Sequence, residues 1–98
     1  MARVELAVEV GDDVERILDH LASHDVENSA ARIREIIQAA NVLSTNPLIG
    51  RPAMGDTREL IIGPRSRGYV ALYRYVPEID TVFVVALRSQ REAGYKRS

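Results

Sequence analysis

The 98-residue sequence contains no cysteine. A disulfide framework and a thiolate zinc site are therefore excluded, and a reducing compartment is permitted. No stretch approaches the roughly 18 apolar residues that a membrane-spanning helix needs. The opening MARVELAVEV alternates apolar with charged residues, unlike the apolar run of a signal peptide. We therefore expect a cytoplasmic protein without membrane contact.

Motifs for phosphate binding, nucleophilic catalysis and metal binding are also missing. Residues 63–68, GPRSRG, have the glycines of a phosphate-binding loop but neither its lysine nor the helix that follows it. Ser66 and Ser89 have no recognisable base nearby in the sequence. His20 and His24 are four residues apart, a spacing at which two imidazoles can share a metal, but a third ligand is missing. We expect no cofactor and no metal.

The composition is that of an ordinary soluble globule, with 46% hydrophobic and 28% charged residues. Such a chain fits one domain, residues 1–98, with a modest core. A tight partner would therefore contribute much of the stability of the folded state.

The charges are divided unequally between the two halves. Residues 1–49 hold four arginines against nine acidic residues, whereas residues 50–98 hold nine basic residues against five acids. Twelve of the 13 basic residues are arginine, which suits bidentate contacts with carboxylates or phosphates, although a coding bias would explain the same ratio. The second half is the candidate contact surface.

Hydrophobic periodicity predicts a strand and two helices in the first half. The opening residues alternate with a period of two up to Val10, and Gly11 ends this strand. Asp12 fits the N-cap of a helix over 13–24. A second helix, capped by Asn28 or Ser29, carries an apolar stripe and ends before Pro47; the stripe is Ala30, Ile33, Ile36, Ile37, Ala40 and Leu43.

Three further strands are predicted after a turn-rich loop, at Thr57 to Ile62, Tyr69 to Val76 and Thr81 to Arg88. PEID, residues 77–80, makes a tight turn between the last two. The predicted fold is α+β: an N-terminal strand, an antiparallel two-helix hairpin, and then a three-stranded antiparallel sheet that the hairpin covers.

Tyrosines and arginines mark the candidate binding surface. Tyr69, Tyr73 and Tyr75 share one face of a strand with Ala71, and Arg74 points to the other. We expect the tyrosine face to be the open side of the sheet, suited to an interface or to stacking bases, though such rings can equally cap a small core. Arginines at strand ends and loops would grip phosphates or acidic side chains, or remain solvated; they are Arg51, Arg58, Arg65, Arg67, Arg88 and Arg91.

The order of these elements resembles the RelE/ParE superfamily of type II toxin-antitoxin toxins. The resemblance covers essentially the whole chain and rests on GRP at 50–52, TREL at 57–60, GYVALYRY at 68–75 and RSQREAGY at 88–95. It implies a toxin that arrests growth and is neutralised by an antitoxin encoded next to it. RelE-like members cut mRNA on the ribosome, and ParE-like members poison DNA gyrase.

Matching positions favours the ParE-like branch. Val70 and Ser89 stand where RelE-like nucleases place arginines, and Glu59 and Ile61 stand where such enzymes often carry lysines, while Tyr95 matches a terminal catalytic tyrosine. The resemblance therefore implies a gyrase inhibitor of the plasmid-stabilisation type that acts by binding rather than by catalysis. It also implies that the toxin contacts DNA only through the antitoxin and that Arg88 to Ser98 is the segment that faces gyrase.

Two alternatives stay open: a ribosome-dependent endoribonuclease using Arg91, Tyr95 and Arg88, and an inert antitoxin-binding relic. An antitoxin is expected to cover the exposed sheet face and the groove beside the helices, by helix-in-groove contacts or strand addition. The residues expected to bind the antitoxin or the target are Arg58, Arg65, Arg67, Tyr69, Tyr73, Arg74, Arg88 and Arg91.

Overall fold

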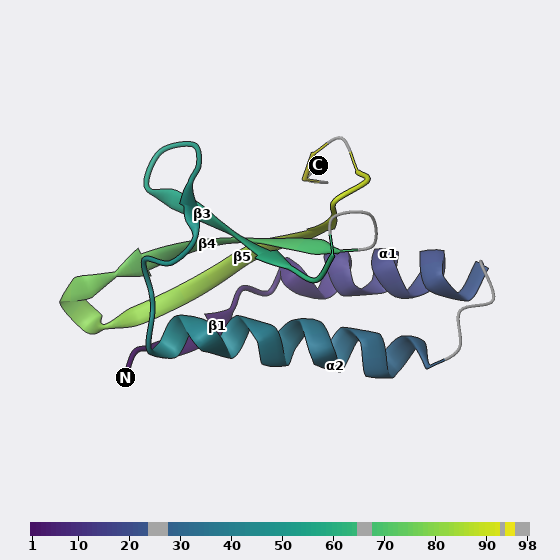
Figure 1. The fold of residues 1–98 in the computed structure, drawn as a ribbon, viewed down its shortest axis with the longest axis horizontal. Helices are drawn as coiled ribbons and strands as arrows, with labels where there is room; N and C mark the ends of the chain where they lie inside the picture. The colour runs from purple at the N-terminus through teal and green to yellow at the C-terminus, as the bar shows by residue number, and fades with distance from the viewer. Residues whose placement is uncertain (24–27, 65–67, 93, 96–98) are drawn as a thin grey trace.

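Two helices cover one face of a sheet whose strands have the order β1-β5-β4-β3-β2 (Figure 1). The computed structural model describes residues 1–23, 28–64, 68–92 and 94–95. The strands are β1 Arg3–Leu6, β2 Arg51–Pro52, β3 Thr57–Ile62, β4 Tyr69–Val76 and β5 Thr81–Ser89. The helices are α1 Val10–Ser23 and α2 Ser29–Ala40, with 3-10 turns η1 Asn41–Ser44 and η2 Pro77–Ile79.

The α+β class is confirmed, and the predicted antiparallel sheet is β3-β4-β5. Two strands enlarge it. β1 runs parallel to β5 at one edge, with Arg3 opposite Thr81 and Leu6 opposite Val84. The two-residue β2 lies antiparallel to β3 at the other edge. It belongs to the segment before Thr57 that was predicted to be a turn-rich loop. The sheet is therefore mixed.

The first strand is shorter than predicted. It ends at Leu6, and α1 begins at Val10, because the chain turns there: the Val10 N–H donates to the Ala7 carbonyl at 3.0 Å. Val10 is 2% exposed as the first core residue of the helix, whereas Val8 is 91% exposed. Asp12 consequently lies in the first turn of α1 and not at its cap.

The second helix uses a narrower stripe than the periodicity predicts. Ile33, Ile36 and Ala40 are buried, and Leu43 follows them in η1, but Ile37 is 37% exposed. The chain tightens into η1 before the predicted end at Asn46. Asn28 occupies the N-cap in a left-handed conformation (φ 59°), without a side-chain capping bond.

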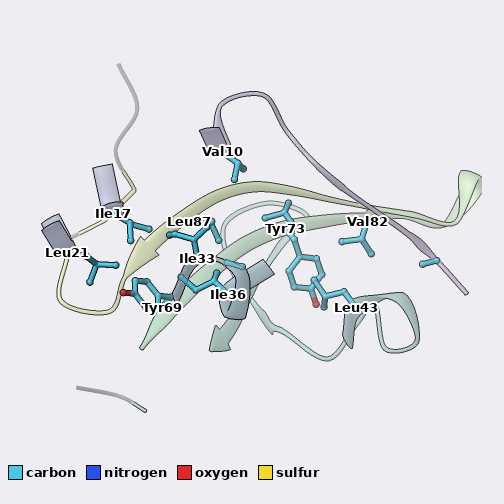
Figure 2. Close-up of a cluster of buried hydrophobic side chains, with 13 residues drawn as sticks. Val10, Ile17, Leu21, Ile33, Ile36, Leu43, Tyr69, Tyr73, Val82 and Leu87 are labelled. Atoms are coloured by element: carbon cyan, nitrogen blue, oxygen red, sulfur yellow. The ribbon is translucent and has the colours of Figure 1, made fainter. Parts of the chain in front are cut away.

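The core lies between the helices and the face of the sheet that carries the tyrosines (Figure 2). Tyr73 is fully buried and Tyr69 is 8% exposed, so the prediction that this is the open face is wrong. The Tyr73 ring lies on the helix-covered side of the sheet. Its hydroxyl accepts a 2.8 Å hydrogen bond from the Gly50 N–H. Since a Cβ at Gly50 would lie 2.7 Å from the Tyr73 ring, only glycine fits there.

The opposite face of the sheet is open to the side on which the described chain ends (Figure 1). Register places Glu59 beside Leu72, and Ile61 beside Val70, on this face. Arg74 and Arg88 lie on it as well, opposite Phe83 and Val70 respectively. This face therefore carries the charged side chains Glu59, Arg74 and Arg88.

Candidate functional site

A cluster of polar groups on the open face joins β2, β3, β5 and the end of the described chain. The Tyr95 hydroxyl donates to a Glu59 carboxylate oxygen at 2.5 Å. The same carboxylate pairs with Arg51 at 3.0 Å and lies 3.8 Å from an Arg88 guanidinium nitrogen. The Arg88 guanidinium carbon lies 5.2 Å from the centre of the Tyr95 ring, within the range of a cation–π contact. Three groups from other parts of the sequence thus converge on Glu59.

Electrostatics set the protonation states in this cluster. The hydrogen bond from Tyr95 and the neighbouring arginines lower the pKa of Glu59, so its carboxylate is ionised at neutral pH. Burial and the adjacent Glu59 carboxylate raise the pKa of Tyr95 above its usual value of 10.0. The phenol therefore stays protonated, which makes Tyr95 a poor general base in this arrangement.

The positions where a nuclease of the superfamily would carry arginines have other environments. Val70 is 1% exposed and belongs to the packed part of the sheet. The Ser89 N–H donates to a Glu92 carboxylate oxygen at 2.7 Å, and the Ser89 hydroxyl accepts from the Arg91 N–H at 3.1 Å. Ser89 is therefore a turn residue at the end of β5.

The predicted arginines have separate roles. Arg58 lies on the helix-covered side, where its guanidinium donates to the carbonyls of Leu48 and Gly50 at 3.1 and 2.8 Å. Arg74 pairs with Asp56 on the open face at 3.0 Å, and both side chains are largely exposed. Arg58 thus ties a loop to β3, while Arg74 is available at the surface.

Two more of the predicted arginines, Arg88 and Arg91, lie in or beside the turn at the end of β5. Arg91 is exposed there. The Arg88 guanidinium is mostly buried, and its Nε has no hydrogen-bond partner among the described residues. Arg65 and Arg67 lie outside the described residues. Of the predicted binding residues, Arg88 joins the cluster around Glu59 and Arg91 is exposed at the turn, whereas Tyr69 and Tyr73 lie in the core.

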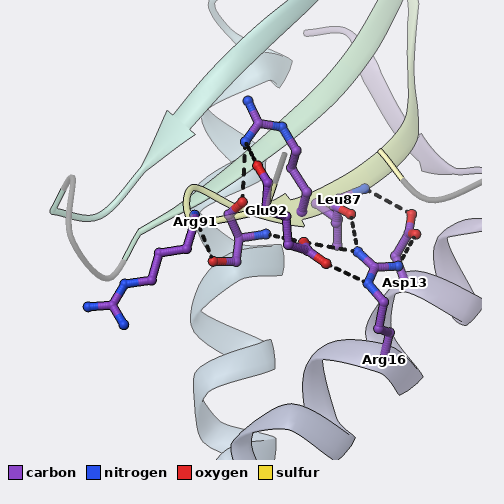
Figure 3. Close-up of polar contacts among 7 residues, drawn as sticks. Asp13, Arg16, Leu87, Arg91 and Glu92 are labelled. Atoms are coloured by element: carbon purple, nitrogen blue, oxygen red, sulfur yellow. Dashed lines mark hydrogen bonds and ion pairs between the residues drawn. The ribbon is translucent and has the colours of Figure 1, made fainter. Parts of the chain in front are cut away.

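A second cluster, which the sequence reading missed, holds the turn against α1 (Figure 3). Arg16 binds both carboxylate oxygens of Glu92, at 2.7 and 3.2 Å, and one oxygen of Asp13 at 2.8 Å. One signal was available: Ser89 and Glu92 form the S-x-x-E pattern of a capping box, and the Ser89 N–H donates to the Glu92 carboxylate as in that motif, while the Ser89 hydroxyl accepts from the Arg91 N–H. Nothing in the sequence pattern pointed to Arg16 as their partner.

A pocket of about 310 Å³ lies between α2 and the β3–β4 connection. Its wall combines charged side chains from the helix with apolar groups from the sheet; the lining residues are Arg32, Glu35, Ile36, Ile62, Gly63, Pro64 and Tyr69. It lies beside the helical hairpin, where a groove for the antitoxin was predicted.

The described part of the chain contains neither a candidate metal site nor a candidate membrane-spanning helix. No group of three or more His, Cys, Asp or Glu side chains is arranged there to hold a metal ion. His20 is exposed on α1, and His24 lies outside the described residues. Neither described helix is long and apolar enough to cross a membrane.

The family model described as "ParE toxin of type II toxin-antitoxin system, parDE" matches residues 4–94 of this chain. The chain belongs to the ParE toxin family. A search of curated proteins finds no match. The ParE fold is also seen in a solved structure, described as "Chromosomal ParDE TA system from P. aeruginosa", at 17% identity and a TM-score of 0.71. That alignment covers 91% of this chain and 96% of the other.

The ParE-type identity matches the resemblance found in the sequence, and the match takes in every element of the fold from Val4 to the turn at Glu92. Arg51, Glu59 and Arg88 of the cluster, and the turn at the end of β5, lie inside the matched range, and Tyr95 directly follows it. These two features are the candidate functional site of this ParE-family toxin.

Proposed function

We propose that this toxin arrests growth by binding DNA gyrase and that a cognate antitoxin neutralises it. One observation supports binding over RNA cleavage: the ionised Glu59 carboxylate lies among Arg51, Arg88 and Tyr95. In a nuclease, such groups would face the phosphate and stabilise its developing negative charge. Here the Glu59 carboxylate offsets one of the two guanidinium charges and accepts the Tyr95 hydroxyl hydrogen, so the cluster presents less positive charge to a phosphate.

The proposed gyrase-facing element is the segment that begins at Arg88. Arg91 is exposed at its turn and can meet acidic side chains of a partner. Arg88 and Tyr95 fix the path of this segment across the open face.

The proposed antitoxin contacts are the exposed part of the open face and the pocket beside α2. Arg74 and Ile61 are exposed on the former, and Ile61 is 40% exposed. An acidic antitoxin segment would pair with Arg74 and with other basic groups of the second half, Arg58, Arg65, Arg67 and Arg91 included. The binding mode is helix-in-groove packing or strand addition.

The deciding experiment separates the toxin from its co-expressed antitoxin. The free toxin is then tested for gyrase inhibition and for ribosome-dependent cleavage of mRNA. We expect inhibited supercoiling or trapped gyrase–DNA cleavage complexes, and we expect Tyr95→Phe to retain this inhibition. Adding the antitoxin back should abolish it.

Three results would decide against the proposal. Cleavage of mRNA that requires ribosomes and is lost in Tyr95→Phe would establish the endoribonuclease, whose support is the contact between Arg88 and Tyr95. Absence of any growth defect on induction would establish the inert relic. Failure to co-purify with the product of an adjacent reading frame would remove the antitoxin from the proposal.

A further inference from the structure

Strand β5 continues beyond its neighbour at one edge of the sheet. β1 pairs with it only from Thr81 to Val84, and the Ala7 N–H then donates to the Val84 carbonyl before the chain turns into α1. No strand among the described residues pairs with β5 past Val84 on this side. Backbone groups of a buried strand need partners, so something else must satisfy them.

Side chains from the first turns of α1 take the place of the missing strand. The Leu87 N–H donates to Asp13 Oδ2 at 2.9 Å, and Arg16 Nη2 donates to the Leu87 carbonyl at 3.1 Å. Asp13 is fully buried, and its other oxygen accepts from Arg16 Nη1. One acidic and one basic residue, three apart on the helix, thus hold both backbone groups of Leu87 (Figure 3).

The same guanidinium also holds the turn that starts the C-terminal segment. Its Nε and Nη2 bind the two oxygens of Glu92, which in turn accepts the Ser89 N–H. Arg16 and Glu92 are 76 positions apart, and their side chains are 28% and 21% exposed. The hydrogen bond that Arg16 donates to Glu92 raises the pKa of Arg16, as expected for a partly buried pair.

We propose that Arg16 is a positioning residue, which orients residues 89–92 of the toxin for its target by clamping Glu92 to the edge of β5. The inference rests on the proposed gyrase-facing role of this segment. Lysine cannot replace Arg16, because three nitrogens of one planar group bind three different partners. Arg16 itself is not part of the hydrophobic core, since α1 packs through Val10, Ile17 and Leu21.

The test compares Arg16→Met, Arg16→Lys and Glu92→Ala with a matched control, Arg34→Met, which changes an exposed arginine on α2. Amide hydrogen exchange and gyrase inhibition are measured on each toxin after its release from the antitoxin. We expect exchange at Leu87 and Ser89 to accelerate at least tenfold in Arg16→Met, with Val82 and Val84 unchanged. The inhibitory concentration should rise at least tenfold in Arg16→Met and Arg16→Lys, and less in Glu92→Ala.

The outcomes separate the clamp from the proposed function. Unchanged exchange at Leu87 and Ser89 would overturn the clamp, and faster exchange with unaltered inhibition would overturn the positioning role. If the wild type itself does not inhibit gyrase, the proposed function fails, while the exchange data still decide the clamp. Should Arg16→Met not fold, as judged by circular dichroism, Glu92→Ala decides by the same criteria, because it leaves the buried Asp13 paired with Arg16.

Discussion

Along β4, neighbouring residues enter two different environments. Tyr73 is fully buried under the helices, with one polar contact, to Gly50. Arg74, the next residue, faces the other side, where its side chain is 48% exposed and pairs with Asp56. The helix-covered face is stabilised mainly by burial of apolar surface, whereas the open face depends on charged pairs that water and salt weaken.

This difference separates stability from function. The buried face leaves little surface for a partner, although it contains the tyrosines that the sequence marked as binding residues. The open face contributes less to folding but presents charge, and it contains the cluster around Glu59. Substitutions on the two faces should therefore differ in how much they lower the free energy of unfolding and in how that loss depends on pH and salt.

The largest effect is expected from Tyr73→Ala. Removing a fully buried aromatic ring should lower the free energy of unfolding by about 3–5 kcal/mol. Urea denaturation of the purified toxin measures it. The matched control is Tyr75→Ala, on the same face but only half-buried, which should cost clearly less. Equal losses would show that the sheet margin is as tightly packed as its centre.

Tyr73→Phe isolates the one polar contact in this part of the core. The Gly50 N–H would lose its acceptor in a buried setting, which we expect to cost about 1–3 kcal/mol. The change in urea midpoint at constant slope measures this loss. A stability equal to that of the wild type would mean that the hydroxyl only fills space.

On the open face, Glu59→Gln should change the pH dependence of stability. The lowered pKa of Glu59 means that its contribution is present above the unfolded value, near 4.5, and is lost as the pH falls through the folded value. Wild type should therefore exceed Glu59→Gln in stability at neutral pH, and the two should converge in acid. Urea midpoints across this range measure the difference; a constant gap would contradict the assignment.

The smallest effect is expected for the Arg74–Asp56 pair. Both side chains are largely exposed, so Arg74→Ala should cost about 0.2–1 kcal/mol, and less at high salt. Thermal unfolding of Arg74→Ala and Asp56→Ala at low and high salt measures it. A loss above that range, insensitive to salt, would place Arg74 in the core and erase the contrast between the faces.

Much of the fold followed from local patterns. The three antiparallel strands, both helices and their order are set by hydrophobic periodicity and turn residues, which act over a few neighbouring positions. The register of β4 with β5 was not predictable, because the irregularity between Leu72 and Tyr73 shifts the pairing by one residue. The parallel pairing of β1 with β5 was also missed, since it joins segments from opposite ends of the chain.

The candidate site was foreseen only in part. Arg88 and Tyr95 were marked from their positions in the terminal segment, but Glu59 was noted only as an absent lysine. Its role becomes visible only in the folded chain, where Glu59 on β3 contacts Tyr95, a residue 36 positions later in the sequence. Asp13 and Arg16 were hidden for the same reason, because their partners are on β5 and beyond.

The sequence by itself determined the α+β class and the division into an acidic first half and a basic second half, and its motif order was enough to indicate the toxin superfamily. Only the tertiary structure decided which face of β4 is buried. A period of two defines two faces but not which one the helices cover; that choice depends on how the Tyr73 ring packs against the helices and Gly50. It also decided which arginines meet carboxylates, since pairing depends on distances that only the folded chain sets.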